Sequence, residues 1–304
     1  MADITGYWFF SCSPSIWEVD LFLKTNPEYG KYTINKNHRD KIWPGQLGVI
    51  RVGTDRRSKH KLQGRDKLHP GVYAIVEILD FPIWSIDEDD EFYVDKTLNK
   101  KERFRVKIRY LKNLINNPLL IRTMETNPTI NQDTLFIHGF QSATWPLTKN
   151  AFNEIINTIG IRNQVLVNVE NENANTDQAI TDLELKYQNA VPEIKEIISK
   201  RIERGKVASE IKKINSYKCQ VCEAFGQNPY SFKKSDGEYY IETHHINPVS
   251  NLAQGSLGIS NLITVCANHH RQFHYGENIL ENNAKDHLVI KISGESRRIE
   301  KAIY

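Results

Sequence analysis

The sequence predicts an α+β protein with an N-terminal mixed β-barrel, a helical linker and a small C-terminal metal-bound fold. Two observations carry this prediction. Short apolar runs separated by turn residues recur through the first part of the chain, which is typical of strands with short helices between them. Further on, cysteines and histidines are spaced as metal ligands are. We expect domains at residues 1–161 and 191–304, joined by a linker at residues 162–190.

The N-terminal part is expected to hold most of the strands. These are residues 7–12, 45–53, 71–80 and 104–111. The first is short and aromatic, as a buried strand is, and the last alternates apolar with basic residues, as a half-exposed strand does. The expected helices are residues 15–23, 118–124 and 151–159. Ser13 or Ser15 would cap the first of them, and Gly160 would end the last.

The middle of the chain reads as a linker that leads into helices. Residues 165–169 could form one more strand, and from Glu170 onward Asn, Glu and Thr dominate, as in linkers. A helix is expected at residues 177–188. Pro192 opens a longer helix whose isoleucines form one stripe and which leads straight into Cys219. Residues 287–292 are expected to form a closing strand.

Two spaced pairs of residues predict a structural zinc site. The first pair is Cys219-x-x-Cys222 and the second is Cys266-x-x-His269. Two such pairs, each with two residues between its members and joined by a long segment, are typical of tetrahedral zinc sites. Buried, unliganded cysteines are the alternative. That alternative leaves unexplained why three of the four cysteines fall in this pattern.

The remaining histidines of this stretch indicate a second chemistry. His244 and His245 are adjacent, so in an extended segment they point to opposite sides. His270 and His274 are four residues apart, which on a helix puts both on one face, ready to share a metal. Asn261 lies between the two groups, before an apolar run. Surface histidines beside a zinc knuckle are the alternative, and they would not require this order.

This order of residues resembles the HNH endonuclease family, over roughly residues 217–275. The resemblance implies a ββα-metal finger, in which a two-stranded hairpin and one helix grip a metal. It also implies that His245 is the general base and that His244, His270 and His274 bind the catalytic metal. Asn261 would hold the hairpin loop and orient the base histidine.

The chain departs from this family at its second knuckle. The zinc-stapled branch usually has Cys-x-x-Cys-His there, whereas this chain has Cys266-x-x-His269-His270. We interpret His269 as the substituted zinc ligand, and the departure leaves open whether His269 or His270 serves zinc. The catalytic ion is expected to be Mg²⁺ or Mn²⁺. Ni²⁺ is an alternative, because histidine suits transition metals. Arg271 would add a phosphate contact.

The N-terminal part resembles an EVE domain, a member of the PUA-like group of nucleic-acid readers. The residues that carry this likeness are Tyr7–Pro14 with Trp17, Pro44-Gly45-Gln46, Gly71–Ile75 and Gln141–Leu147. Where the family often has Gly-Asp, this chain has Gly45-Gln46. The resemblance implies a modified base flipped out of the helix into an aromatic-walled pocket, where it stacks on rings and its edge is read by hydrogen bonds.

Candidate residues of this pocket are Trp17 and Trp84, because each follows a strand end, together with Ser11 and Ser13. Core packing is an equally good explanation for either tryptophan.

A basic loop is the candidate for phosphate contacts. It contains Arg56, Arg57, Lys59, Lys61 and Arg65. A mobile loop of this kind can follow a DNA backbone, although a solvated loop is the usual fate of a charge run. The net charge of +3 is too small to indicate nucleic acid by itself.

These features together predict a modification-dependent, type IV-like restriction endonuclease. Its partner would be double-stranded DNA with 5-methylcytosine or 5-hydroxymethylcytosine, and a homodimer is expected, because one finger cuts one strand. Free thiols as metal ligands indicate the cytoplasm, and no apolar run is long enough to cross a membrane. A nuclease on unmodified nucleic acid and a non-catalytic zinc-stapled reader are the alternatives.

Overall fold

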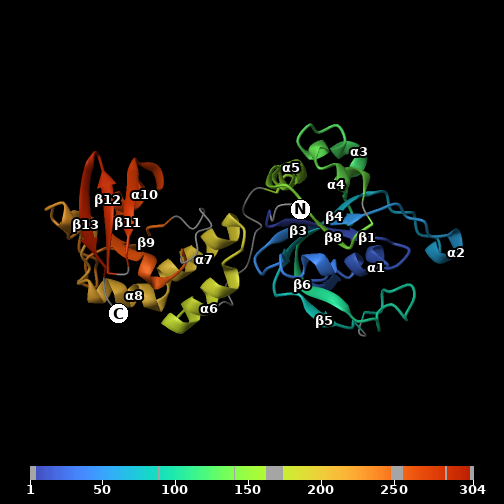
Figure 1. Cartoon of the computed structure of the whole chain (residues 1–304), viewed down its shortest axis with the longest axis horizontal. Coiled ribbons are helices and arrows are strands. Elements are labelled where there is room, and N and C mark those ends of the chain that lie inside the picture. The colour runs from blue at the N-terminus through green and yellow to red at the C-terminus, as the bar shows by residue number, and fades with distance from the viewer. Residues whose placement is uncertain are drawn as a thin grey trace. The chain divides into compact units, whose positions relative to one another are not determined.

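The computed structural model describes residues 5–87, 90–139, 141–161, 174–247, 256–284 and 286–301. The chain divides into two compact units, Met1–Val167 with Asn189–Val191 and Asn168–Gln188 with Pro192–Tyr304 (Figure 1). The predicted α+β class, with a sheet-rich first part and a metal-finger second part, is confirmed. The predicted boundaries at residues 161 and 190 stay a prediction, and the expected strand at residues 165–169 lies outside the described residues.

One curled mixed sheet forms the centre of the first unit. Its strands follow the order β2-β6-β4-β3-β1-β8, with β5 paired to β6 and β7 paired to β4. The strands are β1 (Tyr7–Cys12), β2 (Tyr29–Thr33), β3 (Leu47–Val52), β4 (Gly71–Ile78), β5 (Ile83–Ser85), β6 (Arg103–Asn113), β7 (Leu119–Leu120) and β8 (Thr144–Pro146). Among these pairings β1 and β3 run parallel and the others antiparallel.

The central strands are buried on both faces. Every residue of β3 and β4 is buried, which explains why their sequences are apolar runs without alternation. The core on one side of the sheet includes Trp8, Phe10, Ile50, Val76 and Ile108. Short helices complete the unit: α1 (Val19–Lys24), α2 (Lys59–Leu62), α3 (Ile121–Met124), α4 (Thr134–His138) and α5 (Lys149–Ile159).

Two predicted helices of this unit begin later than expected. α1 starts at Val19 and not at residue 15, because the Trp17 backbone pairs with Tyr93 in an isolated bridge. Neither Ser13 nor Ser15 caps it, since the cap residue is Glu18 and makes no side-chain hydrogen bond. Residues 119–120 pair with β4 as a short strand, so the helix expected from residue 118 starts at Ile121.

The second unit begins with three helices. These are α6 (Asp177–Tyr187), α7 (Pro192–Arg204) and α8 (Lys206–Ile214). The long helix expected after Pro192 is thus broken at Gly205, whose backbone is extended, with ψ at −178°. A Cβ at Gly205 would lie 3.0 Å from the main-chain oxygen of Ala174, so the close approach of the two segments favours glycine there.

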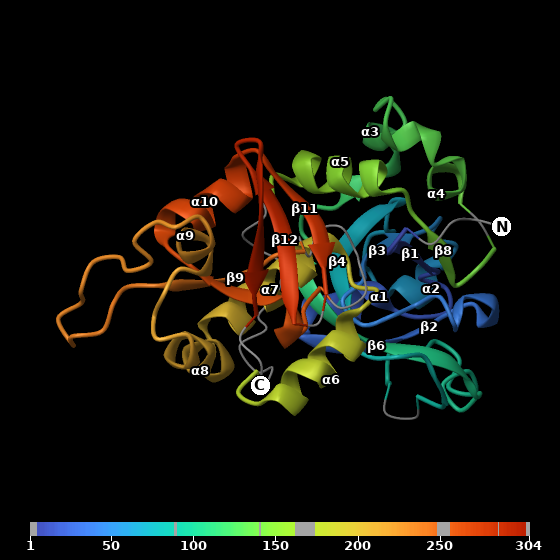
Figure 2. The ribbon, with the colours of Figure 1, turned by 60° about the vertical axis from the view of Figure 1, so that its left-hand side comes forward.

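A ββα finger and a three-stranded sheet follow these helices. The finger consists of α9 (Gln220–Ala224), β9 (Glu242–His245), β10 (Leu262–Val265) and α10 (Ala267–Tyr275), and α9, β9 and α10 lie together in Figure 2. The sheet consists of β11 (Asn278–Asn283), β12 (His287–Ile292) and β13 (Glu295–Glu300). Cys219, Ile263 and Val265 of the finger share one core with Leu288 and Ile290 of β12.

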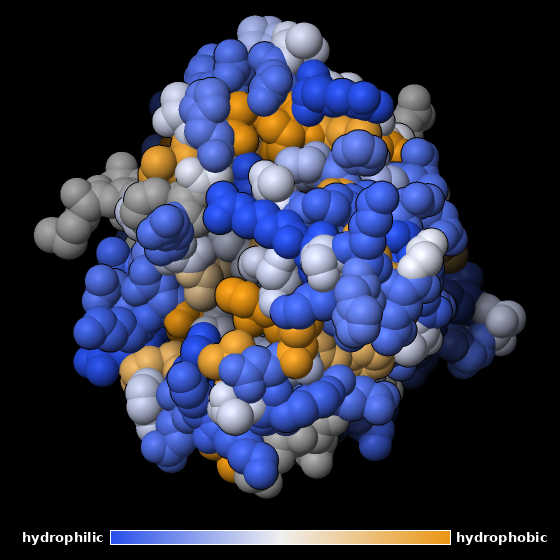
Figure 3. Space-filling view, turned by 90° about the vertical axis from the view of Figure 1, so that its right-hand side faces the viewer, coloured by the Kyte–Doolittle hydropathy of each residue, from blue (hydrophilic) through white to orange (hydrophobic). Residues whose placement is uncertain are grey.

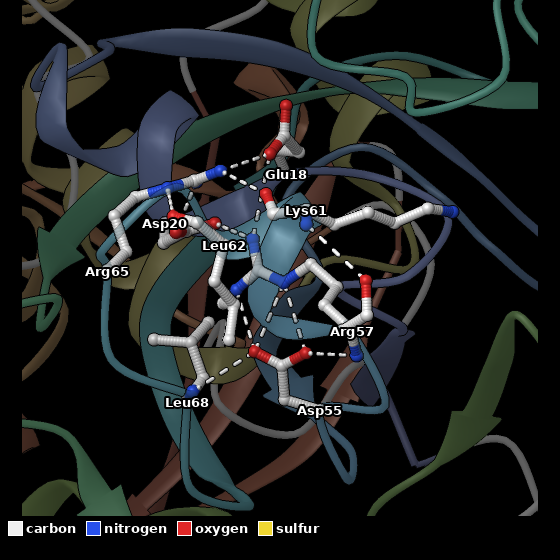
Figure 4. A network of polar contacts seen from close by, with 9 residues as sticks. Glu18, Asp20, Asp55, Arg57, Lys61, Leu62, Arg65 and Leu68 are labelled. Carbon is white, nitrogen blue, oxygen red and sulfur yellow. Dashed lines mark hydrogen bonds and ion pairs between the residues drawn. The ribbon is translucent and has the colours of Figure 1, made fainter.

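A buried network of charges ties the basic loop of the first unit to α1 (Figure 4). The Arg57 side chain is fully buried, and it donates to Asp20 Oδ1 at 2.8 Å and to Asp55 Oδ2 at 2.7 Å. Arg65 donates to Asp20 Oδ2 at 2.7 Å and to Glu18 Oε1 at 2.6 Å. Burial alone would raise the pKa of Asp55, but hydrogen bonds from Arg57 outweigh it and hold that pKa below its ordinary value.

We expect Arg57→Ala to lower the free energy of unfolding by roughly 3–5 kcal/mol, because it removes the arginine paired with the buried Asp55 carboxylate and one of the two arginines paired with Asp20. Urea unfolding followed by circular dichroism measures this loss. Lys59→Ala, which removes an exposed charge from the same loop, is the matched control and should stay within about 0.5 kcal/mol of the parent. Equal stability of the two variants would contradict the structural role of the network.

Candidate functional site

Three sulfurs and one ring nitrogen converge at the base of the finger. Cys219 precedes α9 and Cys222 lies within it, while Cys266 caps α10 and His269 lies in its first turn. His269 Nδ1 is 3.4 Å from the Sγ atoms of Cys219, Cys222 and Cys266, and the Sγ atoms of Cys222 and Cys266 are 3.9 Å apart. A tetrahedral zinc ion requires separations of about 3.6 Å between sulfur and nitrogen and about 3.8 Å between sulfurs. The four residues therefore fit zinc.

Three further histidines form a second cluster, separate from the first. His244 lies on β9, and His270 and His274 lie on α10. The Nε2 atoms of His270 and His274 are 3.1 Å apart, and the His244 ring centre is 4.8 Å from each of the other two. One ligand atom from each residue lies within 4.8 Å of the others. The structure thus places His269 with the sulfurs and His270 with the histidines.

Surrounding residues orient this histidine cluster. The Phe273 ring stacks on His244 with their planes 14° apart. Glu242 Oε2 accepts from His270 Nδ1, and the Tyr240 hydroxyl donates to the same carboxylate. With Nδ1 engaged by Glu242, His270 is left with Nε2 for a metal, as in the carboxylate–histidine pairs behind many metal sites.

Electrostatics keep the cluster ready to bind a cation. Burial and then the neighbouring His270 lower the pKa of His244 to about 3, and the same two causes lower the pKa of His274. His244 and His274 are therefore neutral near pH 7 and offer lone pairs. His244 Nδ1 is buried and has no hydrogen-bond partner among the described residues. Three imidazoles leave coordination positions open, as a catalytic metal requires.

His245 points to the other face of the same strand. Its Nδ1 lies 2.8 Å from Glu203 Oε1 and 2.8 Å from Ser199 Oγ, both on α7. Glu203 Oε1 also accepts from the His245 backbone N–H at 3.2 Å. Because an ionised carboxylate only accepts hydrogen bonds, the proton of the neutral ring lies on Nδ1, and Nε2 keeps its lone pair. Nε2 itself is buried without a partner among the described residues.

Asn261 holds the loop of the finger. Its side-chain amide donates to the main-chain oxygens of Asn247 at 3.1 Å and Ser256 at 2.7 Å, and its oxygen accepts from the Asn247 N–H at 2.8 Å. The structure gives no hydrogen bond between Asn261 and the His245 ring. The expected orienting role therefore falls to Glu203, which sequence reasoning missed.

No sequence motif identifies Glu242 or Glu203 as a partner of these histidines, but strand alternation could have predicted the position of Glu242. Glu242 precedes His244 by two residues on a strand, so strand alternation places both on the same face. Glu203 is 42 residues from His245 along the chain and lies on a helix with many charges, so only the packing of α7 on β9 brings it close.

The first unit contains a pocket of about 940 Å³ at the ends of β1 and β3. Ser11, Ser13 and Trp17 line it, as expected of pocket residues. Trp17 Nε1 donates to Asp90 Oδ2 at 2.7 Å, so the ring is fixed at the wall. Two tyrosines, Tyr32 and Tyr93, add aromatic lining.

Trp84 is not part of this pocket, which corrects its predicted placement. It lies on the short strand β5, 57% exposed, and packs edge-on against Phe104 of β6. A strand end is a barrel mouth only where the strands close around a cavity, and no residue of β5 lines this pocket. Trp84 is one of the large hydrophobic residues that reach the surface. Figure 3 shows one face of the protein, on which hydrophobic residues appear among hydrophilic ones.

Some of the side chains that were predicted to contact phosphates are exposed, and others are paired with carboxylates. Arg56, Lys59, Lys61 and Arg271 are exposed, and Arg56 also lines the pocket. Arg57 is not available to DNA, because its guanidinium is enclosed by Asp20 and Asp55. Arg65 is half-buried and paired with Glu18 and Asp20. Two of the arginines that were expected to contact phosphates therefore hold the basic loop to α1 instead.

Comparison with known proteins agrees with the metal finger. Residues 219–276 match the HNH endonuclease family, so the C-terminal part carries an HNH endonuclease domain, as the resemblance predicted. The type IV methyl-directed restriction enzyme EcoKMcrA of Escherichia coli strain K12 is 38% identical over 61 residues. That match spans 20% of this chain and 21% of the relative.

Solved structures resemble the N-terminal half. A hypothetical protein from Leishmania major covers 51% of this chain and 94% of its own, with a TM-score of 0.35 and 11% identity. Human THYN1, solved in complex with 5-methylcytosine-containing DNA, covers 50% of this chain and 96% of its own, with a TM-score of 0.34 and 9% identity. No helix in the described part of the chain is long and apolar enough to cross a membrane.

We expect purified protein to bind one zinc ion that survives His270→Ala and His274→Ala but is lost in Cys266→Ser. His269→Cys should keep it, because thiolate replaces imidazole in tetrahedral zinc sites. Metal analysis by mass spectrometry together with limited proteolysis of the finger measures this. Loss of zinc in His270→Ala with retention in His269→Ala would reverse the assignment of the two histidines.

Proposed function

We propose that this chain is a metal-dependent endodeoxyribonuclease that cuts DNA containing a modified cytosine, 5-methylcytosine or 5-hydroxymethylcytosine. The observation that carries the proposal is the arrangement on β9, where His244 faces a three-histidine cluster and His245 faces Glu203. A finger that only binds zinc has no use for either arrangement. The HNH family match gives the same reaction class.

Hydrolysis of a phosphodiester needs a base for water, a counter-charge for the phosphate and help for the leaving oxygen. His244, His270 and His274 would hold a divalent ion, which supplies Lewis-acid stabilisation of the developing negative charge. Mg²⁺ or Mn²⁺ is proposed. The all-histidine set also suits Ni²⁺.

His245 takes the proton of the attacking water in this mechanism. Nε2 accepts the proton, and Glu203 stabilises the imidazolium that results, because its carboxylate is already bonded to Nδ1. Burial alone would raise the pKa of Glu203, yet hydrogen bonds from the His245 ring and backbone outweigh it, so the carboxylate stays ionised. The proposal requires that DNA binding admit a water to Nε2, which the described residues enclose.

The pocket of the first unit supplies the proposed recognition. Its volume of about 940 Å³ lies in the range of ligand pockets, and its aromatic wall of Trp17, Tyr32 and Tyr93 suits a flipped base. Ser13 and Asp90 offer polar atoms for the base edge. The relative from Escherichia coli is named methyl-directed, which supports the same substrate class.

The organisation of the chain follows from this division of labour. We propose that residues 1–161 read the base, that residues 162–190 link the parts and that residues 191–304 cut. One finger cuts one strand, so a homodimer is the proposed form for double-strand cleavage. A nuclease on unmodified DNA would use the same finger without the pocket.

Matched plasmids test the function directly. We expect cleavage only of plasmid carrying 5-methylcytosine or 5-hydroxymethylcytosine, only with Mg²⁺, Mn²⁺ or Ni²⁺, and none after EDTA treatment. Agarose gels of modified and unmodified plasmid with each metal measure this. Equal cutting of every plasmid would refute base recognition and leave the nuclease, whereas no cutting with any metal would favour the non-catalytic reader.

The base and its partner are tested by substitution. His245→Ala should reduce the single-turnover cleavage rate by roughly 10²–10⁴-fold, because general-base catalysis contributes about that much. Glu203→Ala should reduce it by about 10–100-fold, with Glu203→Asp partly restored. Both should keep their zinc and their DNA affinity. His60→Ala, an exposed histidine of α2, is the control. Full activity of His245→Ala would remove it from the mechanism.

A further inference from the structure

Arg51 is a buried arginine in the wall of the first unit's pocket. It lies near the end of β3, where it pairs with Ser11 of β1, and both residues line the cavity. Only 7% of its surface is exposed. An arginine this deeply buried is normally paired with a carboxylate.

The hydrogen bonds of Arg51 leave its charge uncompensated. Its Nε donates to the main-chain oxygen of Phe136, and its Nη2 donates to that of Ile137 at 2.9 Å. Because a guanidinium has five N–H donors, these bonds leave three, two of them on Nη1. No carboxylate within ion-pair distance of Arg51 exists among the described residues. Burial alone lowers its pKa, without an opposing acidic neighbour.

Arg57 shows what the same chain does with a structural arginine. It is also buried, but two carboxylates enclose it and together raise its pKa despite burial. The two side chains lie six residues apart, on the same stretch of chain. The contrast indicates that the missing counter-charge of Arg51 comes from a ligand.

The surroundings of Arg51 suit an anion. The pocket wall also carries Lys31, Arg56 and Arg103, against the two acidic residues Asp90 and Glu125. Ser11 Oγ is buried and has no hydrogen-bond partner among the described residues.

Gly139 fits closely against the guanidinium. Its φ is +83°, and a Cβ there would approach Arg51 Nη2 to 3.3 Å, so the backbone comes near only because this residue is glycine. The Gly139 main chain therefore lies against both Nη1 and Nη2 of Arg51, and Arg51 itself is part of the pocket lining.

We propose that Arg51 and Ser11 form a phosphate subsite, which binds a backbone phosphate next to the modified cytosine whose base occupies the pocket. The inference rests on the proposed function and adds a site to it. A phosphodiester oxygen pair matches the remaining guanidinium donors, and the serine hydroxyl can donate to the same group. Such a contact makes binding sensitive to one particular linkage.

Neutral linkages test this subsite with the unaltered protein. Duplexes carry one 5-methylcytosine and a methylphosphonate on its 5′ side, its 3′ side or, as control, five nucleotides away. EDTA is avoided, so that the zinc is kept, and binding is followed by fluorescence anisotropy without added divalent metal. We expect one of the two adjacent linkages to weaken binding about 10-fold or more and the distant one to have little effect.

Substitution gives the second arm. Arg51→Gln should bind the natural duplex as weakly as the parent binds the neutral one, and should lose its sensitivity to the methylphosphonate. Its slope of log affinity against log salt should fall by about 0.9, the loss of one phosphate contact. Arg39→Gln removes the same charge from an exposed site and is the matched control. Thermal unfolding verifies that both variants fold. If Arg51→Gln does not fold, the neutral-linkage experiment still tests the subsite, because it uses the unaltered protein.

The outcomes separate the subsite from the function. If the parent prefers 5-methylcytosine DNA but tolerates both neutral linkages, the subsite is wrong and the function stands. If the parent shows no preference and Arg51→Gln keeps the full salt slope, both are wrong. If it shows no preference and the slope falls, Arg51 binds phosphate in a protein that does not read the base.

Discussion

The meeting of three sulfurs and the His269 ring at one point is the constraint on which the finger depends. Cys219 and Cys222 lie at the start of α9, and Cys266 and His269 lie at the start of α10, so the four ligand atoms bring the starts of the two helices together. The chain between them then has to return as β9 and β10. Because α10 is anchored at its first turn, His270 and His274 reach β9 from a fixed direction.

One strand separates the two chemical tasks of the finger. Successive side chains of β9 alternate between faces, so His244 joins the histidine cluster while His245 meets Glu203 and Ser199 of α7. A ring nitrogen of His245 lies beside the Glu203 carboxylate, whereas a ring nitrogen of His244 lies beside His270 and His274. The two rings are therefore suited to different roles. A one-residue shift of β9 against β10 would exchange the faces and abolish both arrangements.

Two buried arginines of the first unit, Arg57 and Arg51, also differ in their surroundings. Around Arg57 carboxylates balance the cation, and the result is a rigid loop attached to α1. Around Arg51 main-chain oxygens only orient the cation, and its charge faces a pocket lined by further basic residues. Both arginines are buried, yet one contributes to stability and the other is suited to binding, because the difference lies in what surrounds them.

Local spacing by itself predicted the cluster of three cysteines with a histidine, the cluster of three histidines and most strands of the first unit, since Cys-x-x-Cys pairs, histidines at strand and helix spacing and apolar runs express geometry within a few residues. The break at Gly205, the burial of Arg57 and the exposure of Trp84 were decided by tertiary structure. Tertiary structure also decided that Glu203 lies beside His245 and that Arg51 is buried without a counter-ion among the described residues. Each of these depends on contacts between segments far apart in the chain, and side-chain burial and pairing are set by such contacts, not by residue type.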